Sequence, residues 1–167
     1  AYFKVAKENT RPFCVRSGEY CLKVYGTEFN LNTYDEENIE AVLVKGSVGF
    51  QANEAAPEKR LKVNQWGLAN SKAGTSVIQD VDVTSYIAWK NHDLIFVNEE
   101  LESIMKKVSR WYDVNIIFED EVSKAVRFNG NIPKYAELEK LLYVMEKTSD
   151  VRFRITDKTI RITKRKK

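Results

Sequence analysis

The sequence predicts an α+β protein in which an all-β segment is followed by a smaller segment of alternating strands and helices. Residues 1–84 contain short runs of alternating apolar and polar residues separated by turn residues, with no convincing helical period. Residues 85–167 contain two amphipathic helical stripes, each flanked by strand patterns. A chain of 167 residues is long enough for two small domains, and we place their boundary after residue 84.

The first segment is predicted to consist of short strands. The apolar alternation occurs in six runs, which are AYFKV, FCVRS, CLKVYG, EFNLNTY, AVLVKG and SVGFQA. Short strands at this spacing favour a sandwich, a barrel or a solenoid. Polar and turn-forming residues favour exposed loops at 53–60 and 70–76. Gly26 and Gly46 each follow a strand pattern, so we expect them in turns or where the backbone packs closely.

The second segment is predicted to fold as two strand–helix–strand units. Asn98 is a suitable N-cap for the first helix, and Glu99 and Glu100 suit the positive end of its dipole. Strand patterns follow the two helices at 114–118 and 151–155. The apolar stripes consist of Leu101, Ile104, Met105 and Val108 in the first helix, and of Leu138, Leu141, Leu142 and Met145 in the second.

An offset of 37 residues relates these two units. It carries the apolar stripe of the first helix onto that of the second, and it also carries Asp113 and the strand beyond it onto Asp150 and its strand. Any two amphipathic helices share such a stripe, but the shared aspartate and strand favour a structural duplication. The expected core consists of Phe96, Leu101, Ile104, Met105, Val108, Val114, Ile116, Phe118, Phe128, Leu138, Leu141, Leu142, Phe153 and Ile155.

The net charge of +3 does not favour nucleic-acid binding. Residues 1–84 carry a net charge of −1, and the four basic residues at 164–167 account for the +4 of the second segment. We expect this basic tail to be a frayed and solvated end. No basic stripe marks the rest of the sequence, so we expect no nucleic-acid partner.

The sequence lacks the residue patterns of common catalytic and metal sites. His92 is the single histidine, and there is no phosphate-binding loop, GxGxxG or Gly-x-Ser-x-Gly motif. The acidic residues at 35–37 lack the ligand spacing of a calcium loop, and those at 119–121 are typical of a solvated turn. We expect no enzyme, cofactor or metal site, although two carboxylates distant in sequence leave a glycosidase open.

Two cysteines flank a turn signal at Ser17 and Gly18. A two-residue loop there would place Cys14 opposite Cys21 and permit a cross-strand disulfide. A three-residue loop would place Cys14 opposite residue 22 and disfavour the bridge. We favour two small buried side chains over a disulfide. The cysteines permit an oxidising compartment without demonstrating one.

Several motifs occur in a fixed order along nearly the whole chain. They are AYFKV at 1–5, PFCV at 12–15, VYGTEFNL at 24–31, LVKGSV at 43–48, AWKNHDLIFVNEELESIMKKVSRWYDVNIIF at 88–118, FNGNI at 128–132 and DVRFRITDKTIRI at 150–162. In this order they resemble the FecR family of bacterial anti-sigma sensors. One departure is NQWGLA at 64–69, where the family usually has a Pro-Gly turn, and this puts in doubt only the shape of that loop.

The resemblance implies a FecR-like β domain at 1–84 and an STN-like domain at 85–167, similar to the short N-terminal domain of secretins and TonB-dependent transducers. It implies the periplasmic part of a transmembrane anti-sigma factor, with targeting and inner-membrane segments upstream of residue 1. The implied partners are the signalling domain of an outer-membrane TonB-dependent transducer and, through a cytoplasmic segment outside this chain, a sigma factor. Such a protein regulates transcription by relaying a signal through protein–protein binding.

The alternation of the closing strand predicts a partner-binding face. Arg152 and Arg154 alternate with apolar residues, and Arg127 does so in an earlier strand, so all three should lie on the open side of a sheet. Exposed arginines bind carboxylates with two hydrogen bonds, which suits an acidic protein surface, but they also keep a one-sided sheet soluble. Trp111 and Tyr112 are weaker candidates, because aromatic residues at a helix end usually pack into the core.

The alternative interpretation is a periplasmic protein that binds or processes polysaccharide through its β segment and carries an accessory domain. This activity would need an aromatic platform on the β segment. The aromatic residues there that could contribute, Tyr20, Tyr25, Tyr34 and Trp66, share no common spacing. We therefore predict a non-enzymatic protein that relays a signal by binding other proteins.

Overall fold

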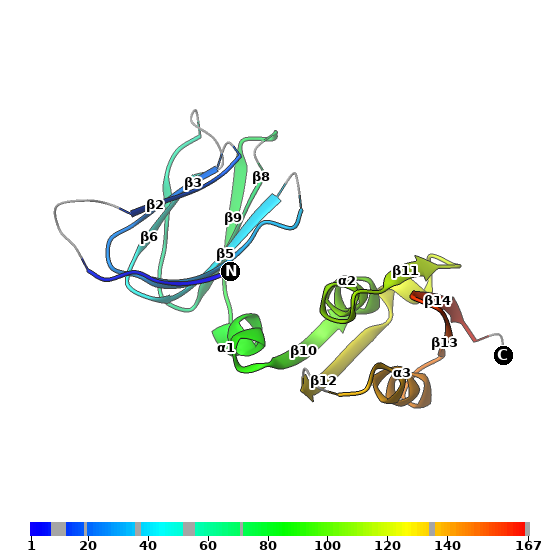
Figure 1. Ribbon diagram of the computed structural model, residues 1–167. Helices are drawn as coiled ribbons and strands as arrows, with labels where there is room; N and C mark the ends of the chain where they lie inside the picture. Colours follow the sequence, from blue (N-terminus) through cyan, green and yellow to red (C-terminus); the bar gives the residue numbers. More distant parts are fainter. Residues whose placement is uncertain are drawn as a thin grey trace. The chain divides into compact units, whose positions relative to one another are not determined.

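The computed structural model describes residues 1–7, 13–18, 20–35, 38–51, 56–70, 72–133 and 136–165. The chain divides into two compact units, Ala1–Ile87 and Ala88–Lys167 (Figure 1). The first contains β1 (Tyr2–Lys4), β2 (Phe13–Ser17), β3 (Tyr20–Val24), β4 (Glu28–Asn32), β5 (Asn38–Lys45), β6 (Val48–Gln51), β7 (Lys59–Leu61), β8 (Gln65–Asn70), β9 (Thr75–Asp80) and α1 (Val83–Ile87). The second contains η1 (Ala88–Asn91), β10 (Asp93–Glu100), α2 (Leu101–Tyr112), β11 (Asn115–Phe118), η2 (Ser123–Ala125), β12 (Arg127–Pro133), α3 (Leu138–Lys147), β13 (Val151–Thr156) and β14 (Thr159–Lys164). The described residues are thus mostly strand with three short α-helices, a mixture consistent with an α+β protein.

Two sheets build the first unit. One has the strand order β1-β4-β5-β8-β9 and the other the order β2-β3-β6-β7, and all their pairings are antiparallel. Both sheets contribute to one hydrophobic core, in which Phe29 and Leu43 of the first sheet join Leu22 and Phe50 of the second. All four side chains are completely buried, so the two sheets are held together by apolar burial.

A short helix, α1, ends the first unit. The sequence predicts no helix before residue 85, but α1 begins at Val83. Asp82 stabilises its first turn, because Asp82 Oδ1 accepts the N–H of Thr84 at 2.9 Å. This backbone hydrogen bond holds the pKa of Asp82 below its usual value. A helix of five residues is too short to show an apolar period, which is why the pattern misses it.

Gly26 and Gly46 confirm the prediction made for them. Both have left-handed backbone angles, with φ of 80° and 92°. A Cβ on Gly46 would lie 2.6 Å from the carbonyl oxygen of Gly26, and one on Gly26 would lie 2.5 Å from the Cα of Lys7. Each glycine is therefore required both by its backbone angle and by the space available.

The hairpin of β2 and β3 corrects the prediction for the cysteines. Ser17 pairs with Tyr20, so Cys14 lies opposite Lys23 and Cys21 lies opposite Arg16. The cysteines are diagonal neighbours and both are free. Cys14 is exposed and Cys21 is only half-buried, so the expectation of two buried side chains is also wrong. Partial burial raises the pKa of the Cys21 thiol.

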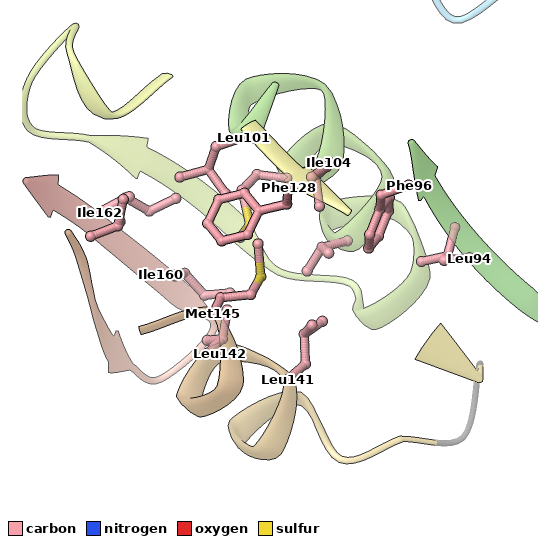
Figure 2. Packing of buried hydrophobic residues seen from close by; sticks show 13 residues of the cluster. Leu94, Phe96, Leu101, Ile104, Phe128, Leu141, Leu142, Met145, Ile160 and Ile162 are labelled. Atoms are coloured by element: carbon pink, nitrogen blue, oxygen red, sulfur yellow. The ribbon is translucent and has the colours of Figure 1, made fainter. Parts of the chain in front are cut away.

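The second unit is built around α2 and α3, which share one core with two sheets. The antiparallel pair β10-β12 forms one sheet, and the other has the order β11-β14-β13, with β11 parallel and β13 antiparallel to β14. Figure 2 shows side chains from both helices converging with side chains from the strands. The predicted apolar stripes are confirmed, because seven of their eight residues are buried and Leu138 is half-buried.

Ile155 does not belong to this core, although the alternation of its strand predicts it there. Its side chain remains 38% exposed. Ile155 lies near the end of β13, which is an edge strand of its sheet, one residue before the last strand position. An edge strand has a neighbour on only one side, so an apolar residue at its end has fewer side chains to cover it.

The beginning of α2 also differs from the prediction. β10 continues through the predicted cap, and α2 begins at Leu101, with Glu100 in the cap position and no side-chain cap. Asn98 instead has a left-handed φ of 48° within an irregularity of β10, and its N–H donates to Asn129 Oδ1 at 2.8 Å. The N–H of Leu101 donates to the carbonyl of Val126 at 2.8 Å, so a neighbouring backbone supplies the acceptor that a cap would provide.

The two helices end in different ways despite the shared aspartate. Asp113 ends α2 in a left-handed conformation, with φ of 55°, and its carboxylate binds Lys158 Nζ at 2.5 Å. The cap of α3 is Thr148, with φ of −102°, and the carbonyl of Asp150 accepts the N–H of Arg165 at 2.6 Å. The offset of 37 residues therefore relates the two helices and the strands that follow them, but the junctions between helix and strand differ in conformation.

Leu141→Ala is expected to lower the free energy of unfolding of the second unit by about 2–5 kcal/mol, because the substitution opens a cavity in a packed core. Val144→Ala in the same helix is the matched control, since Val144 is exposed and its change should stay within about 0.5 kcal/mol. Denaturant titration of the three proteins measures the difference. Equal stability of the two variants would contradict the assigned helix face.

Gly46→Ala is expected to destabilise the first unit by about 1–3 kcal/mol, because the new Cβ meets a carbonyl oxygen at a left-handed φ. Ser47→Ala, at the next and exposed position, should change the stability by no more than about 0.5 kcal/mol. Thermal melts followed by circular dichroism compare the two. A Gly46→Ala protein as stable as the wild type would remove the conformational reason for this glycine.

Candidate functional site

The candidate site is the open face of the sheet β11-β14-β13, which lies near the C-terminal end in Figure 1. On β14, Ile160 and Ile162 are completely buried in the core shared with the helices. Side chains alternate along a strand, so the exposed Arg161 between them points away from that core. Arg152 and Arg154 of β13 are exposed in the same way. We call these three side chains, with Arg165, the arginine face.

The strand register brings the arginines of this face together. Arg154 lies directly opposite Arg161, and Arg152 lies opposite Thr163. Like charges directly opposite each other on antiparallel strands destabilise the pair. The sheet therefore holds two cations at a distance where their mutual repulsion favours an arriving anion.

An open depression of about 450 Å³ lies at the arginine face. It is lined by Glu119, Glu146, Arg152, Phe153, Arg154, Arg161, Thr163 and Arg165. Four guanidinium groups and two carboxylates give this lining an excess of two positive charges. Guanidinium groups remain protonated at any physiological pH and have no acceptor atom, so they can bind anions and cannot serve as general bases.

Both carboxylates of the depression already have partners. Glu119 Oε1 lies 3.7 Å from a guanidinium nitrogen of Arg161, and Glu146 Oε1 accepts the backbone N–H of Phe153 at 2.6 Å. Within the described parts of the chain, the guanidinium groups of Arg152 and Arg154 form no hydrogen bond or ion pair. Both guanidinium groups are therefore available to a ligand.

The end of β14 is fixed by two aspartates, so the prediction of a frayed tail is wrong at Lys164 and Arg165. Asp120 Oδ2 accepts the N–H of Lys164 at 2.6 Å, and the Asp150 carbonyl accepts the N–H of Arg165 at the same distance. Residues 166–167 lie outside the described residues. Asp120 Oδ1 also accepts the N–H of Ser123 at 2.7 Å. The hydrogen bond from Lys164, followed by those from Ser123, holds the pKa of Asp120 below its usual value of 3.8.

Arg127 does not join the arginine face. It lies on β12, in the other sheet of the second unit, where it is exposed as predicted. Its guanidinium group forms an ion pair with Glu100 and donates a hydrogen bond to the carbonyl of Asn98 at 2.5 Å. Arg127 is therefore engaged in fixing the irregular end of β10.

Trp111 and Tyr112, at the end of α2, are half-buried and pack against the core of the second unit. The hydroxyl of Tyr112 donates to the carbonyl of Ala136 at 2.8 Å, and burial raises the pKa of this phenol. Much of the surface of each residue is therefore buried within the second unit. The structure brings together Arg152 and Arg154 but places the other three predicted residues elsewhere.

The sequence patterns did not predict four charged residues of the site. Arg161 alternates with Ile160 and Ile162, so the pattern that singled out the other arginines contained enough information to find it. Glu119, Glu146 and Arg165 lack such a signal, because their positions depend on how a turn, α3 and the chain end meet the sheet.

The described part of the chain contains neither a cluster of metal ligands nor a helix that could span a membrane. Among these residues, no group of three or more His, Cys, Asp or Glu side chains lies close enough to hold a metal ion. Nor does any described helix have the length and apolar character needed to cross a membrane. His92 is an exposed residue with a left-handed φ of 65°, as expected for a turn.

Comparison with known proteins gives a family for the second unit. Residues 93–162 match the family model described as FecR, C-terminal. Two crystal structures of a candidate anti-sigma factor from Parabacteroides distasonis ATCC 8503 have the same fold, with TM-scores of 0.84 and 0.82. Each is 23% identical in sequence, and the similarity covers 99% of this chain and 77% or 76% of the other. Among curated proteins, none matches this sequence.

Asp120→Asn is expected to lower the free energy of unfolding at pH 7, because the ionised carboxylate accepts two backbone N–H groups in the folded state. Its folded pKa is below 3.8, so its contribution is fully present above that pH and is lost as the pH falls through the folded pKa. The difference between wild type and variant should therefore shrink below pH 3.8.

Denaturant titrations from pH 7 to about pH 2 measure this difference. Glu121→Gln is the control, since the side chain of Glu121 is 85% exposed and pairs with Lys124 at the surface. A difference between wild type and Asp120→Asn that stays constant over the whole pH range would contradict the role given to this carboxylate.

Proposed function

The chain belongs to the FecR family, and from this premise we propose that it is the signal-receiving part of an anti-sigma factor and acts by binding other proteins. The observation that carries the proposal is the match of residues 93–162 to the FecR C-terminal domain. The shared fold of the Parabacteroides distasonis protein, itself described as a candidate anti-sigma factor, supports the same role. In such a role the chain regulates a sigma factor and catalyses no reaction.

The finer proposal concerns the compartment and the partners. We propose that this part of the protein lies in the periplasm, where it receives a signal from the signalling domain of an outer-membrane TonB-dependent transducer. The sigma factor would be bound by a cytoplasmic segment outside this chain, across the inner membrane. The ordered motifs of the first unit and the STN-like pattern of the second support this arrangement, because each resembles the extracytoplasmic part of the family.

The arginine face is the docking surface that we propose for the transducer. Arg152 and Arg154 are exposed and lack partners among the described residues, and Arg154 lies opposite Arg161. A protein surface with carboxylates at this position would replace cation–cation repulsion by charge-assisted hydrogen bonds. Arg127, Trp111 and Tyr112 are less suited to this role, because an ion pair or core packing already engages them.

The polysaccharide-binding alternative has no comparable support. A sugar platform needs aromatic rings that are exposed together on one surface. Tyr20 is buried in the core of the first unit, and Trp66 is half-buried, with its Nε1–H donating to Glu40 at 3.4 Å. Two of the four candidate aromatic residues are thus used by the fold, and no observation favours a carbohydrate ligand.

The chain is expected to bind the signalling domain of a TonB-dependent transducer from the same source. A tagged chain incubated with the source envelope fraction identifies the transducer by mass spectrometry, and titration calorimetry with its purified signalling domain measures the affinity. A chain that captures no transducer and binds no such domain would contradict the proposed function.

Replacing Arg152, Arg154 and Arg161 together by serine is expected to weaken this binding at least about tenfold, because the triple variant removes the charged centre of the docking face. Arg127→Ser is the matched control, since it removes an arginine from the other sheet and should leave the affinity unchanged. Circular dichroism checks that all variants are folded. Equal affinities for the triple variant and the wild type would exclude this face as the docking site.

A further inference from the structure

The exposed edge of β13 lies next to the arginine face. β13 is the last strand in the order β11-β14-β13, so one of its sides has no strand neighbour. In an antiparallel pair, alternate residues direct their N–H and C=O groups away from the partner strand. On β13 these residues include Val151 and Phe153, whose N–H groups donate to side chains outside the ladder. The edge is therefore a template on which a further strand can form hydrogen bonds.

A carboxylate already occupies the centre of this edge. Glu146 reaches from α3, and its Oε1 accepts the N–H of Phe153 at 2.6 Å. In an added strand, a backbone carbonyl would take that position. Glu146 thus protects the edge with a group of the same hydrogen-bonding type that a partner would bring, and a partner has to displace it.

We infer that the β13 edge and the arginine face together bind an extended acidic segment of a partner protein, which adds as a strand beside β13 and places alternate carboxylates next to Arg152 and Arg154. The inference rests on the proposed function and names the chemistry of the partner. Alternate residues of the added strand lie two positions apart on one face, and so do these two arginines. Arg154 has Arg161 on its inner side, so a carboxylate that pairs with Arg154 on its outer side offsets the repulsion between these two cations.

The core-facing side of β13 indicates which residues of the added strand would lie between its carboxylates. Phe153 is half-buried, and Ile155 leaves 38% of its surface exposed. Residues of the added strand that alternate with the carboxylates would lie beside these two side chains and cover them. The expected segment therefore alternates acidic and apolar residues over about five positions, a pattern that matches the length and register of β13.

Two capped peptides of about eight residues test the inference against isotope-labelled chain. One alternates Glu with Val, and the other has Gln in place of each Glu. The Glu peptide is expected to shift the amide signals of Phe153 and Ile155 in nuclear magnetic resonance spectra and to slow their hydrogen exchange. The Gln peptide should bind at least about tenfold more weakly, because it lacks the charge that the arginines recognise.

Three variants separate the contributions of the edge and the arginines. The double variant Arg152→Ser/Arg154→Ser should weaken binding of the Glu peptide at least about tenfold, and Arg127→Ser should leave it unchanged. Glu146→Ala should strengthen binding, because it frees the N–H of Phe153 and removes a negative charge from the depression. Alanine favours helices, so α3 should be retained in this variant.

Several outcomes would overturn the inference. Binding of the Glu peptide without a change at the amide of Phe153 would show a general attraction of anions with no strand addition. Sedimentation that reveals a dimer formed through β13 would assign the edge to a second copy of the chain. A transducer domain that binds wild type and Glu146→Ala equally, while neither peptide binds, would remove the inference and leave the proposed function intact. Strand addition by the peptide without any transducer binding would remove the proposed function alone.

Discussion

The burial of Val151, Ile160 and Ile162 against α2 and α3 determines the direction of the neighbouring side chains of the two closing strands. All three are completely buried, and transferring such side chains from water stabilises the fold by about 1.5–3 kcal/mol each. A shift of one residue in either strand would expose them and bury arginines, which is far more costly. The arginine face is thus a geometric consequence of the core, and it keeps its shape as long as that core is intact.

The same constraint explains why the arginines gather although their proximity is unfavourable. Register places Arg154 opposite Arg161, and only Arg161 has a carboxylate near it among the described residues. Solubility alone requires charged residues on an open sheet, but it is equally well served by charges of both signs, which attract each other across strands. An excess of one sign at a depression of about 450 Å³ suits a surface that recognises the opposite charge.

Sequence patterns predicted those features that depend on burial periodicity. The stripes of both helices and the outward direction of Arg152 and Arg154 follow from counting residues, and Arg161 was available from the same count. The failures have a common origin in contacts between distant segments. Asn98 belongs to a residue type that often caps helices. The carbonyl of Val126 accepts the N–H of Leu101 instead, and Asn98 remains in β10. Lys164 belongs to an ordered strand because Asp120, distant in sequence, accepts its N–H.

Glu146 illustrates how one side chain can both protect an edge and prepare it for a partner. An unprotected edge strand pairs with any other exposed strand, and natural proteins prevent this by placing charged groups there. The Glu146 carboxylate, which accepts the Phe153 N–H, repels an acidic segment. Such a segment therefore binds only if the arginines attract it more strongly than Glu146 repels it. A neutral strand would form backbone hydrogen bonds with the edge. These bonds do not compensate for the charge-assisted hydrogen bond between Glu146 and the Phe153 N–H, which the strand has to break. The edge and the arginines therefore select an extended acidic segment only in combination. The edge alone would bind other exposed strands, and the arginines alone would bind other anions.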